Sequence, residues 1–119
     1  MPRVKRGVTS HRRHKKVLAL TKGHRATKHS LFRRANESMI KSLSYAYAHR
    51  RERKGDMRRL WVTRINAASR AEGLTYGQLI HGLKESGVEI NRKMLADMAV
   101  REPESFSNLV SMAREQAKG

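Results

Sequence analysis

The apolar residues between positions 32 and 46 recur with a helical period. Five of them follow one another at steps of three or four residues: Phe32, Ala35, Met39, Leu43 and Ala46. Residues 49–56 are polar on every side, and the stripe then resumes at Met57 and continues through Ile65 until Gly73, a residue type that commonly ends helices. The pattern predicts one long helix over about residues 31–72, with Ser30 as its N-cap.

Three shorter helices are predicted after Gly73. Thr75 and Gln78 have the spacing of a capping box, which opens a helix that reaches about Glu85. Asn91 is an N-cap for a helix over about 92–101, and Pro103 suits the first position of a helix over about 103–117. The predicted core consists of Leu79, Ile80, Leu83, Ile90, Met94, Leu95, Met98, Phe106, Leu109 and Val110, capped by Trp61 and Ile65.

Residues 1–30 show no sustained periodicity, and their one apolar patch is Val17–Leu20. Without apolar surface to bury, they cannot offset a backbone ordering cost of about 1–2 kcal/mol per residue. The fold class is therefore predicted to be all-α, with a long basic N-terminal extension and a long helix joined to a small compact α-helical C-terminal domain. We expect three parts, namely a basic arm (1–30), a further part of the long helix (31–59) and a compact helical domain (60–119).

Charge divides the chain more sharply than hydropathy does. The whole chain has a net charge of +17, and all of it resides in residues 1–64, with 20 Lys/Arg against three acids. Residues 65–119 carry seven bases and seven acids. Such a density of positive charge opposes compaction and favours a polyanionic partner, so the sequence predicts a nucleic-acid-binding protein. We expect the basic arm (1–30) to be disordered without RNA and residues 31–59 to be the RNA-binding part of the long helix.

The candidate contacts to nucleic acid are the basic residues of this first half, because Arg forks phosphate bidentately and Lys provides a point charge. They are Arg3, Lys5, Arg6, Arg12, Arg13, Lys15, Lys16, Lys22, Arg25, Lys28, Arg33, Arg34, Arg50, Arg51, Arg53, Lys54, Arg58, Arg59 and Arg64. A solvated, solubilising surface is the simpler interpretation of a single charge run, but it does not account for +17 within 64 residues.

Metal, cofactor and enzyme interpretations have little support. The histidines at 11, 14, 24, 29 and 49 lie among bases, and the chain has no Cys to complete a ligand set. We expect those histidines to hydrogen-bond or stack on RNA, and no metal or cofactor is predicted. No nucleophile elbow or phosphate-binding Gly-rich loop is present, so no enzyme or small-molecule substrate is predicted.

The aromatic residues of the long helix divide into two kinds. Trp61 lies on the apolar stripe and is predicted to anchor the core, with stacking on a base as the alternative. Tyr45 and Tyr47 lie beside basic residues and are candidates for stacking or ribose contacts.

The stretch Lys54–Arg70, KGDMRRLWVTRINAASR, resembles the L20 family of bacterial large-subunit ribosomal proteins. The matching positions are Lys54, Arg58, Leu60, Trp61, Arg64, Ile65, Asn66 and Arg70. The segments PRVKRGV, RHKKVL, YGQLIHGLK and NRKMLADMAVREPESF are similar to the family too, so the resemblance covers nearly the whole chain. His24 and Met57 depart from it, because the family often has aromatic residues at those two positions.

The resemblance implies a structural constituent of the large ribosomal subunit, located in the bacterial cytoplasm. It implies direct binding to 23S rRNA early in assembly, with Asn66 added to the rRNA-binding set, and contacts with neighbouring large-subunit proteins. Some members of the family repress translation of their own mRNA, which would then be a further partner.

Three alternatives are left open by the residues alone. A nucleoid-type DNA-binding protein would share the charge, but residues 92–101 present mostly apolar side chains where a recognition helix needs polar ones. A membrane-active peptide needs a wide apolar helix face that the arm lacks, and we predict no membrane partner. A cleavable transit peptide would lose its basic character well before Arg64.

Overall fold

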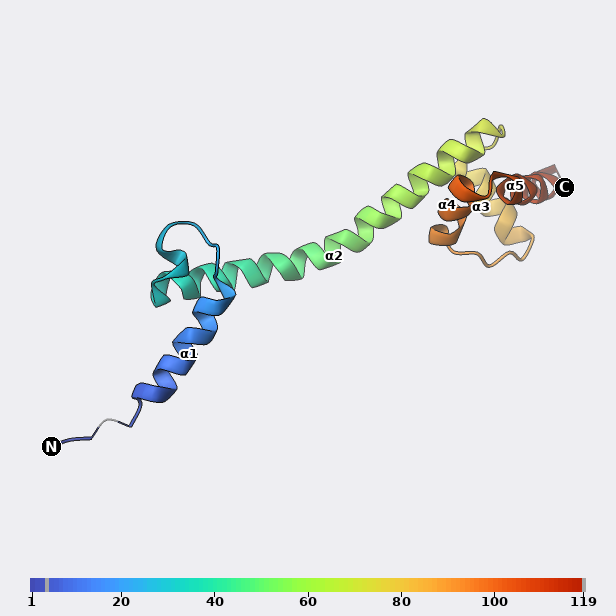
Figure 1. Cartoon of the computed structure of the whole chain (residues 1–119). Coiled ribbons are helices and arrows are strands. Elements are labelled where there is room, and N and C mark those ends of the chain that lie inside the picture. The colour runs from blue at the N-terminus through green and yellow to red at the C-terminus, as the bar shows by residue number, and fades with distance from the viewer. Residues whose placement is uncertain (4, 119) are drawn as a thin grey trace. The chain divides into compact units, whose positions relative to one another are not determined.

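The computed structural model describes residues 1–3 and 5–118, and every regular element in that range is helical. The elements are α1 (Gly7–Leu20), the short 3-10 helix η1 (Ala26–His29), α2 (Phe32–Ala71), α3 (Tyr76–Glu85), α4 (Arg92–Arg101) and α5 (Pro103–Lys118), as labelled in Figure 1. The predicted all-α fold class is confirmed.

The chain forms two compact units, Met1–Arg51 and Glu52–Gly119, and α2 contributes to both. We refer to them as the N-terminal unit and the C-terminal unit. Each unit has its own internal packing.

Helix ends in the C-terminal unit follow the local signals of the sequence. Gly73 has φ +86°, the left-handed conformation that closes α2 at its C-terminus. The capping box of α3 is present, because Gln78 N donates to Thr75 Oγ1 at 3.4 Å and Thr75 N donates to Gln78 Oε1 at 3.0 Å. Asn91 Oδ1 accepts from Met94 N at 2.9 Å and caps α4. These predicted boundaries are confirmed.

The core of the C-terminal unit is built from α3, α4, α5 and the end of α2, which gather together in Figure 1. Its buried side chains are Ile65, Leu79, Leu83, Leu95, Ala96, Phe106, Val110 and Ala113. Gly82 marks the closest approach of α3 and α5, since a Cβ atom built there would lie 2.5 Å from the carbonyl oxygen of Ala113. Only glycine permits this approach, and the sequence did not indicate it.

Most of the predicted core is confirmed, with one clear error. Ile80, Ile90, Leu109 and Trp61 are half-buried against the core, and Met98 is also half-buried. Met94 was predicted to be buried, but its side chain is 54% exposed. Helix α4 turns Leu95 and Ala96 toward the core. Met94 lies about 200° from Ala96 around the helix, since each residue turns the helix by about 100°, and it therefore faces outward.

The N-terminal unit contains two elements that the sequence did not predict. Residues 1–30 were expected to lack regular structure, whereas the structure has α1 and η1 there. The prediction of Ser30 as N-cap of the long helix is also wrong: Ser30 ends η1, its Oγ donating to Thr27 O at 3.3 Å, and α2 begins at Phe32. Disorder of this segment in the absence of RNA stays a prediction.

Candidate nucleic-acid interface

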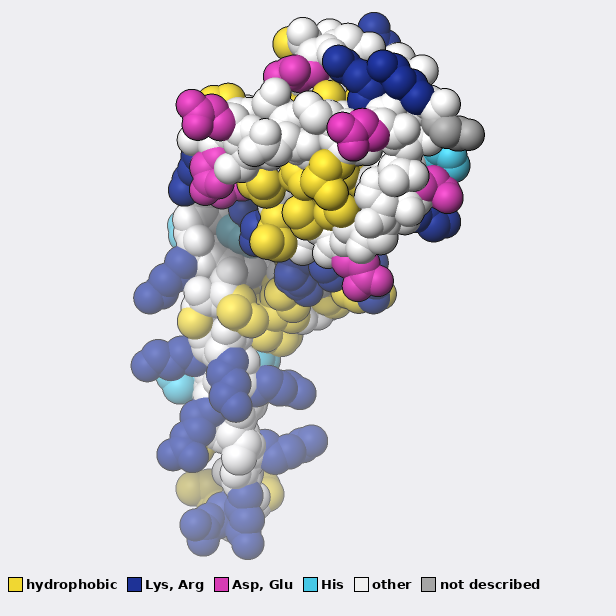
Figure 2. All heavy atoms as spheres, turned by 90° about the vertical axis from the view of Figure 1, so that its right-hand side faces the viewer, with side chains coloured by type: hydrophobic (Ala, Val, Ile, Leu, Met, Phe, Trp, Pro, Cys, Tyr) yellow, Lys and Arg dark blue, Asp and Glu magenta, His cyan; other side chains and the backbone are white. Residues whose placement is uncertain are grey.

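The nineteen basic candidates are all exposed and are distributed over five segments. Three of them precede α1, four lie on α1 and two lie between α1 and η1. Lys28 lies on η1, and the remaining nine project from α2 between Arg33 and Arg64. In Figure 2 the acidic side chains visible on that face lie on the C-terminal unit, while Lys and Arg side chains predominate on the rest of the visible surface.

Few of these charges are neutralised inside the protein. Among the described residues, the candidates form two ion pairs, Arg34 with Glu37 at 3.5 Å and Arg59 with Asp56 at 3.6 Å. Both pairs are exposed neighbours along α2, and exposed pairs of this kind contribute at most about 1 kcal/mol. The basic surface can therefore meet phosphates without first breaking strong internal contacts.

Helix α1 separates its basic residues from a less exposed stripe. Ser10, His14, Val17 and Thr21 follow one another at four-, three- and four-residue steps and are half-buried or buried. The ring of His14 stacks on Phe32 of α2, with centroids 3.8 Å apart. The half-buried aliphatic residues of α1 are Val17 and Leu18, which are adjacent, so no helical period of apolar residues marks α1 in the sequence.

The turn between α1 and α2 is held by polar contacts. His24 Nδ1 and Ser38 Oγ are hydrogen-bonded at 2.7 Å, and His29 Nδ1 donates to His24 O at 3.1 Å. Thr21 is fully buried, and its Oγ1 donates to Leu18 O at 3.2 Å. These hydrogen bonds are made by Thr, Ser and His side chains and not by Lys or Arg. They hold the segment that carries Lys22, Arg25 and Lys28 beside the start of α2.

These contacts change the interpretation of the histidines. His14, His24 and His29, expected to contact RNA, each have a partner within the chain, and His49 stacks on Tyr45. In the part of the chain that the structure describes, no group of three His, Asp or Glu side chains could hold a metal ion.

Trp61 packs against the core of the C-terminal unit and is half-buried there. It also lines a groove together with Arg64, Lys93, Met94 and Arg101, among other residues. Arg101 is paired with Asp97 at 3.1 Å. The anchoring role predicted for Trp61 is consistent with this packing, and one part of the ring remains open to the groove.

Asn66 differs from the other candidates because its side chain serves the fold. Asn66 Oδ1 accepts from Arg70 Nε at 3.2 Å and from Tyr76 N at 3.3 Å. Tyr76 opens α3, and its hydroxyl in turn accepts from Arg92 Nε at 2.6 Å. The amide oxygen of Asn66 therefore joins α2 to the start of α3.

Comparison with known proteins gives the family of this chain. The sequence model of the family described as Ribosomal protein L20 matches residues 3–109. The chain belongs to the ribosomal protein L20 family. All twenty candidate residues, Arg3 to Asn66, lie within the matched range.

Similar proteins match over almost their whole length. A protein of Dehalococcoides mccartyi named large ribosomal subunit protein bL20 is 66% identical over 113 residues, covering 95% of each chain. Proteins of the same name from Moorella thermoacetica and Brevibacillus brevis are 63% and 53% identical over 116 residues, covering 98% of this chain and 96% and 98% of theirs.

Membership of the L20 family makes the chain a structural protein of the ribosome and not an enzyme. None of the helices that the structure describes combines the length and apolar character that crossing a membrane requires.

Proposed function

We propose that this chain binds 23S rRNA directly within the large ribosomal subunit and acts early in the assembly of that subunit in the bacterial cytoplasm. The observation that supports this most is the set of nineteen exposed basic side chains with two internal ion pairs among them. Family membership supplies the ribosome as the setting, and the names of the relatives supply its large subunit.

The proposed division of labour follows the charge. Residues 1–30 and 31–59 carry most of the phosphate contacts, and residues 60–119 form a compact domain that positions them and contacts neighbouring large-subunit proteins. Arg and Lys side chains spread over several helices fit a folded RNA, which offers phosphates at varied positions rather than along one uniform groove.

The dependence of affinity on salt tests direct binding. If the basic surface neutralises about eight phosphates, log K for a 23S rRNA transcript should fall against log salt with a slope of about -6 to -7. Filter binding with the full chain measures this slope. A chain lacking residues 1–30 should give a clearly flatter slope, and an unchanged slope would contradict a role for the arm.

Single substitutions on α2 refine that test. Arg58→Ala should lower the salt slope by about one and leave thermal stability nearly unchanged, because Arg58 is exposed and has no acid partner among the described residues. Lys84→Ala on α3 is the matched control, an exposed base outside the candidate set that should leave the slope unchanged. Equal effects of the two substitutions would mean that net charge alone drives binding.

A nucleoid-type DNA-binding protein is the competing function. Competition between 23S rRNA fragments and duplex DNA of equal length at fixed salt separates the two, and rRNA should win. A preference for the DNA would overturn the proposal.

The same basic surface could bind the protein's own mRNA, since both ligands are folded RNA. We include translational autorepression in the proposal on the basis of the family resemblance. A reporter fused to the native leader of the gene should fall in expression when the chain is supplied in excess, and constant expression would remove this part of the proposal.

A further inference from the structure

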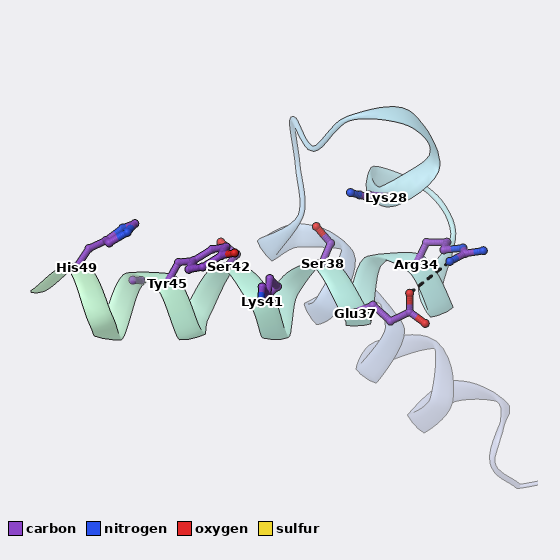
Figure 3. A pocket seen from close by; sticks show the side chains of 9 residues that line it. Lys28, Arg34, Glu37, Ser38, Lys41, Ser42, Tyr45 and His49 are labelled. Atoms are coloured by element: carbon purple, nitrogen blue, oxygen red, sulfur yellow. Dashed lines mark hydrogen bonds and ion pairs between the residues drawn. The ribbon is translucent and has the colours of Figure 1, made fainter.

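The N-terminal unit contains an open groove of about 720 Å³ beside the first half of α2. Figure 3 shows the groove, with Lys28 contributed by η1 and the other labelled side chains by α2. Its basic side chains are those of Lys28, Arg34 and Lys41, and Ser38 and Ser42 add hydroxyl groups. The acid that lines it, Glu37, is paired with Arg34.

An aromatic pair forms one end of this groove. The rings of Tyr45 and His49 are nearly parallel, with an interplanar angle of 6° and centroids 5.9 Å apart. Tyr45 is 52% exposed even though it is aromatic, and no core residue of the described chain covers it. The Nζ atom of Lys41 lies 4.9 Å from the centroid of the Tyr45 ring.

The spacing of these three residues explains the arrangement. Lys41, Tyr45 and His49 are separated by four residues each, so they form a row along one face of α2. Lys41 is exposed, and its flexible stem allows the ammonium group to leave the ring when a stronger anionic partner is present. A flat ligand could then occupy the ring face that the ammonium now covers.

We propose that this groove holds a single unpaired nucleotide of RNA. The base stacks on the Tyr45–His49 pair, and the flanking phosphates are bound by Lys41 and Lys28. A base inside a duplex has both faces covered by its neighbours, whereas a bulged or looped base can be turned outward onto an aromatic side chain. The inference rests on the proposed function and deepens it, because it names the kind of RNA feature that one part of the surface recognises.

Tyr47 provides the comparison within the same helix. It is 56% exposed, and the guanidinium carbon of Arg51 lies 4.5 Å from its ring centroid. Two residues beyond Tyr45, it points about 200° away around the helix and is not part of the groove lining. Each of these two faces of α2 thus has an exposed tyrosine next to a Lys or Arg side chain. Only the Tyr45 face adjoins a groove with further basic side chains and hydroxyl groups.

The test uses the full chain and two RNA hairpins that differ in one nucleotide. One hairpin carries a single bulged 2-aminopurine and the other is fully paired. The unsubstituted chain should bind the bulged hairpin about tenfold more tightly than the paired one and quench its fluorescence, as expected for stacking on an aromatic ring. Tyr45→Leu should abolish both the preference and the quenching while leaving affinity for the paired hairpin within about twofold.

Two control variants make the outcome specific. Tyr45→Phe retains the ring and should keep the preference, and Tyr47→Leu removes the tyrosine of the other face and should also keep it. Absence of preference in the unsubstituted chain, or its survival in Tyr45→Leu, would overturn the inference. If 23S rRNA is still bound with a steep salt slope in that case, the proposed function stands without the nucleotide site.

Discussion

The two units of this chain are stabilised by different means. The N-terminal unit, residues 1–51, carries 15 Lys/Arg and one acid, and among its described residues Thr21 and Ala35 are buried. The C-terminal unit has 12 Lys/Arg and nine acids, and it buries eight hydrophobic residues in one cluster. Apolar burial thus accompanies near-neutral charge, and a dense basic surface accompanies a few polar and aromatic contacts.

The contrast teaches how one chain can combine a stable part with an adaptable one. Burial of apolar surface is the dominant favourable contribution to folding, and the C-terminal unit has it. In the N-terminal unit self-repulsion opposes compaction until counter-charge arrives. We therefore expect the first unit to depend on RNA for its order and the second to fold without it.

The largest effect should come from emptying the centre of the C-terminal core. Leu95 is 1% exposed, so Leu95→Ala should lower the free energy of unfolding by about 2–5 kcal/mol. Thermal or urea unfolding measures this loss. Met94→Ala, one position earlier and 54% exposed, is the matched control and should change stability by less than about 0.5 kcal/mol. Equal losses would show that the burial of α4 is assigned to the wrong face.

A smaller effect is expected where α3 and α5 touch. Gly82→Ala places a methyl group against the backbone of Ala113, and forcing the two helices apart should cost about 1–3 kcal/mol. Gly77→Ala in the same helix meets nothing within 4 Å and should be neutral or slightly stabilising, since Ala favours helices over Gly. Unfolding of both variants under the same conditions decides whether close approach, rather than helix propensity, requires Gly82.

The smallest effect concerns the docking of α1. In the protein without RNA, amides of residues 7–20 should exchange much faster than those of α3 and α5, because α1 contains no buried residue. Phe32→Ala removes the stack with His14 and should speed exchange in α1 by a further factor of about 3–10, the equivalent of a typical aromatic pair.

Leu31→Ala is the control for that variant, since Leu31 is an exposed neighbour that makes no such stack. Binding of 23S rRNA should slow exchange in α1 of the unsubstituted chain. Protection of residues 7–20 equal to that of α5 in the free protein would remove the contrast between the units.

Helix boundaries in the C-terminal unit were predictable because their signals are local. The Thr75–Gln78 capping box, the Asn91 cap and the left-handed Gly73 each act within a few residues, and each lies where the sequence placed it. The basic character of the first half was equally evident, because charge is a property of composition.

Contacts between distant residues were not predictable in this way. The stack of His14 on Phe32 and the bond between His24 and Ser38 join residues 18 and 14 positions apart. Asn66 matched the family motif as an RNA contact, yet its amide oxygen supports the start of α3. None of these three contacts leaves a hydrophobic pattern in the sequence.

The sequence by itself determined that this protein is helical, where its C-terminal helices begin and end, and that its first half is strongly basic. These features depend on capping, periodicity and composition, which act over short stretches of chain. The tertiary structure alone decided that Met94 faces outward, that Gly82 must be glycine, and that Lys28 joins Lys41 and Tyr45 around one groove. The physical reason is that burial and side-chain proximity depend on which segments meet, and distant residues meet only once the chain has folded.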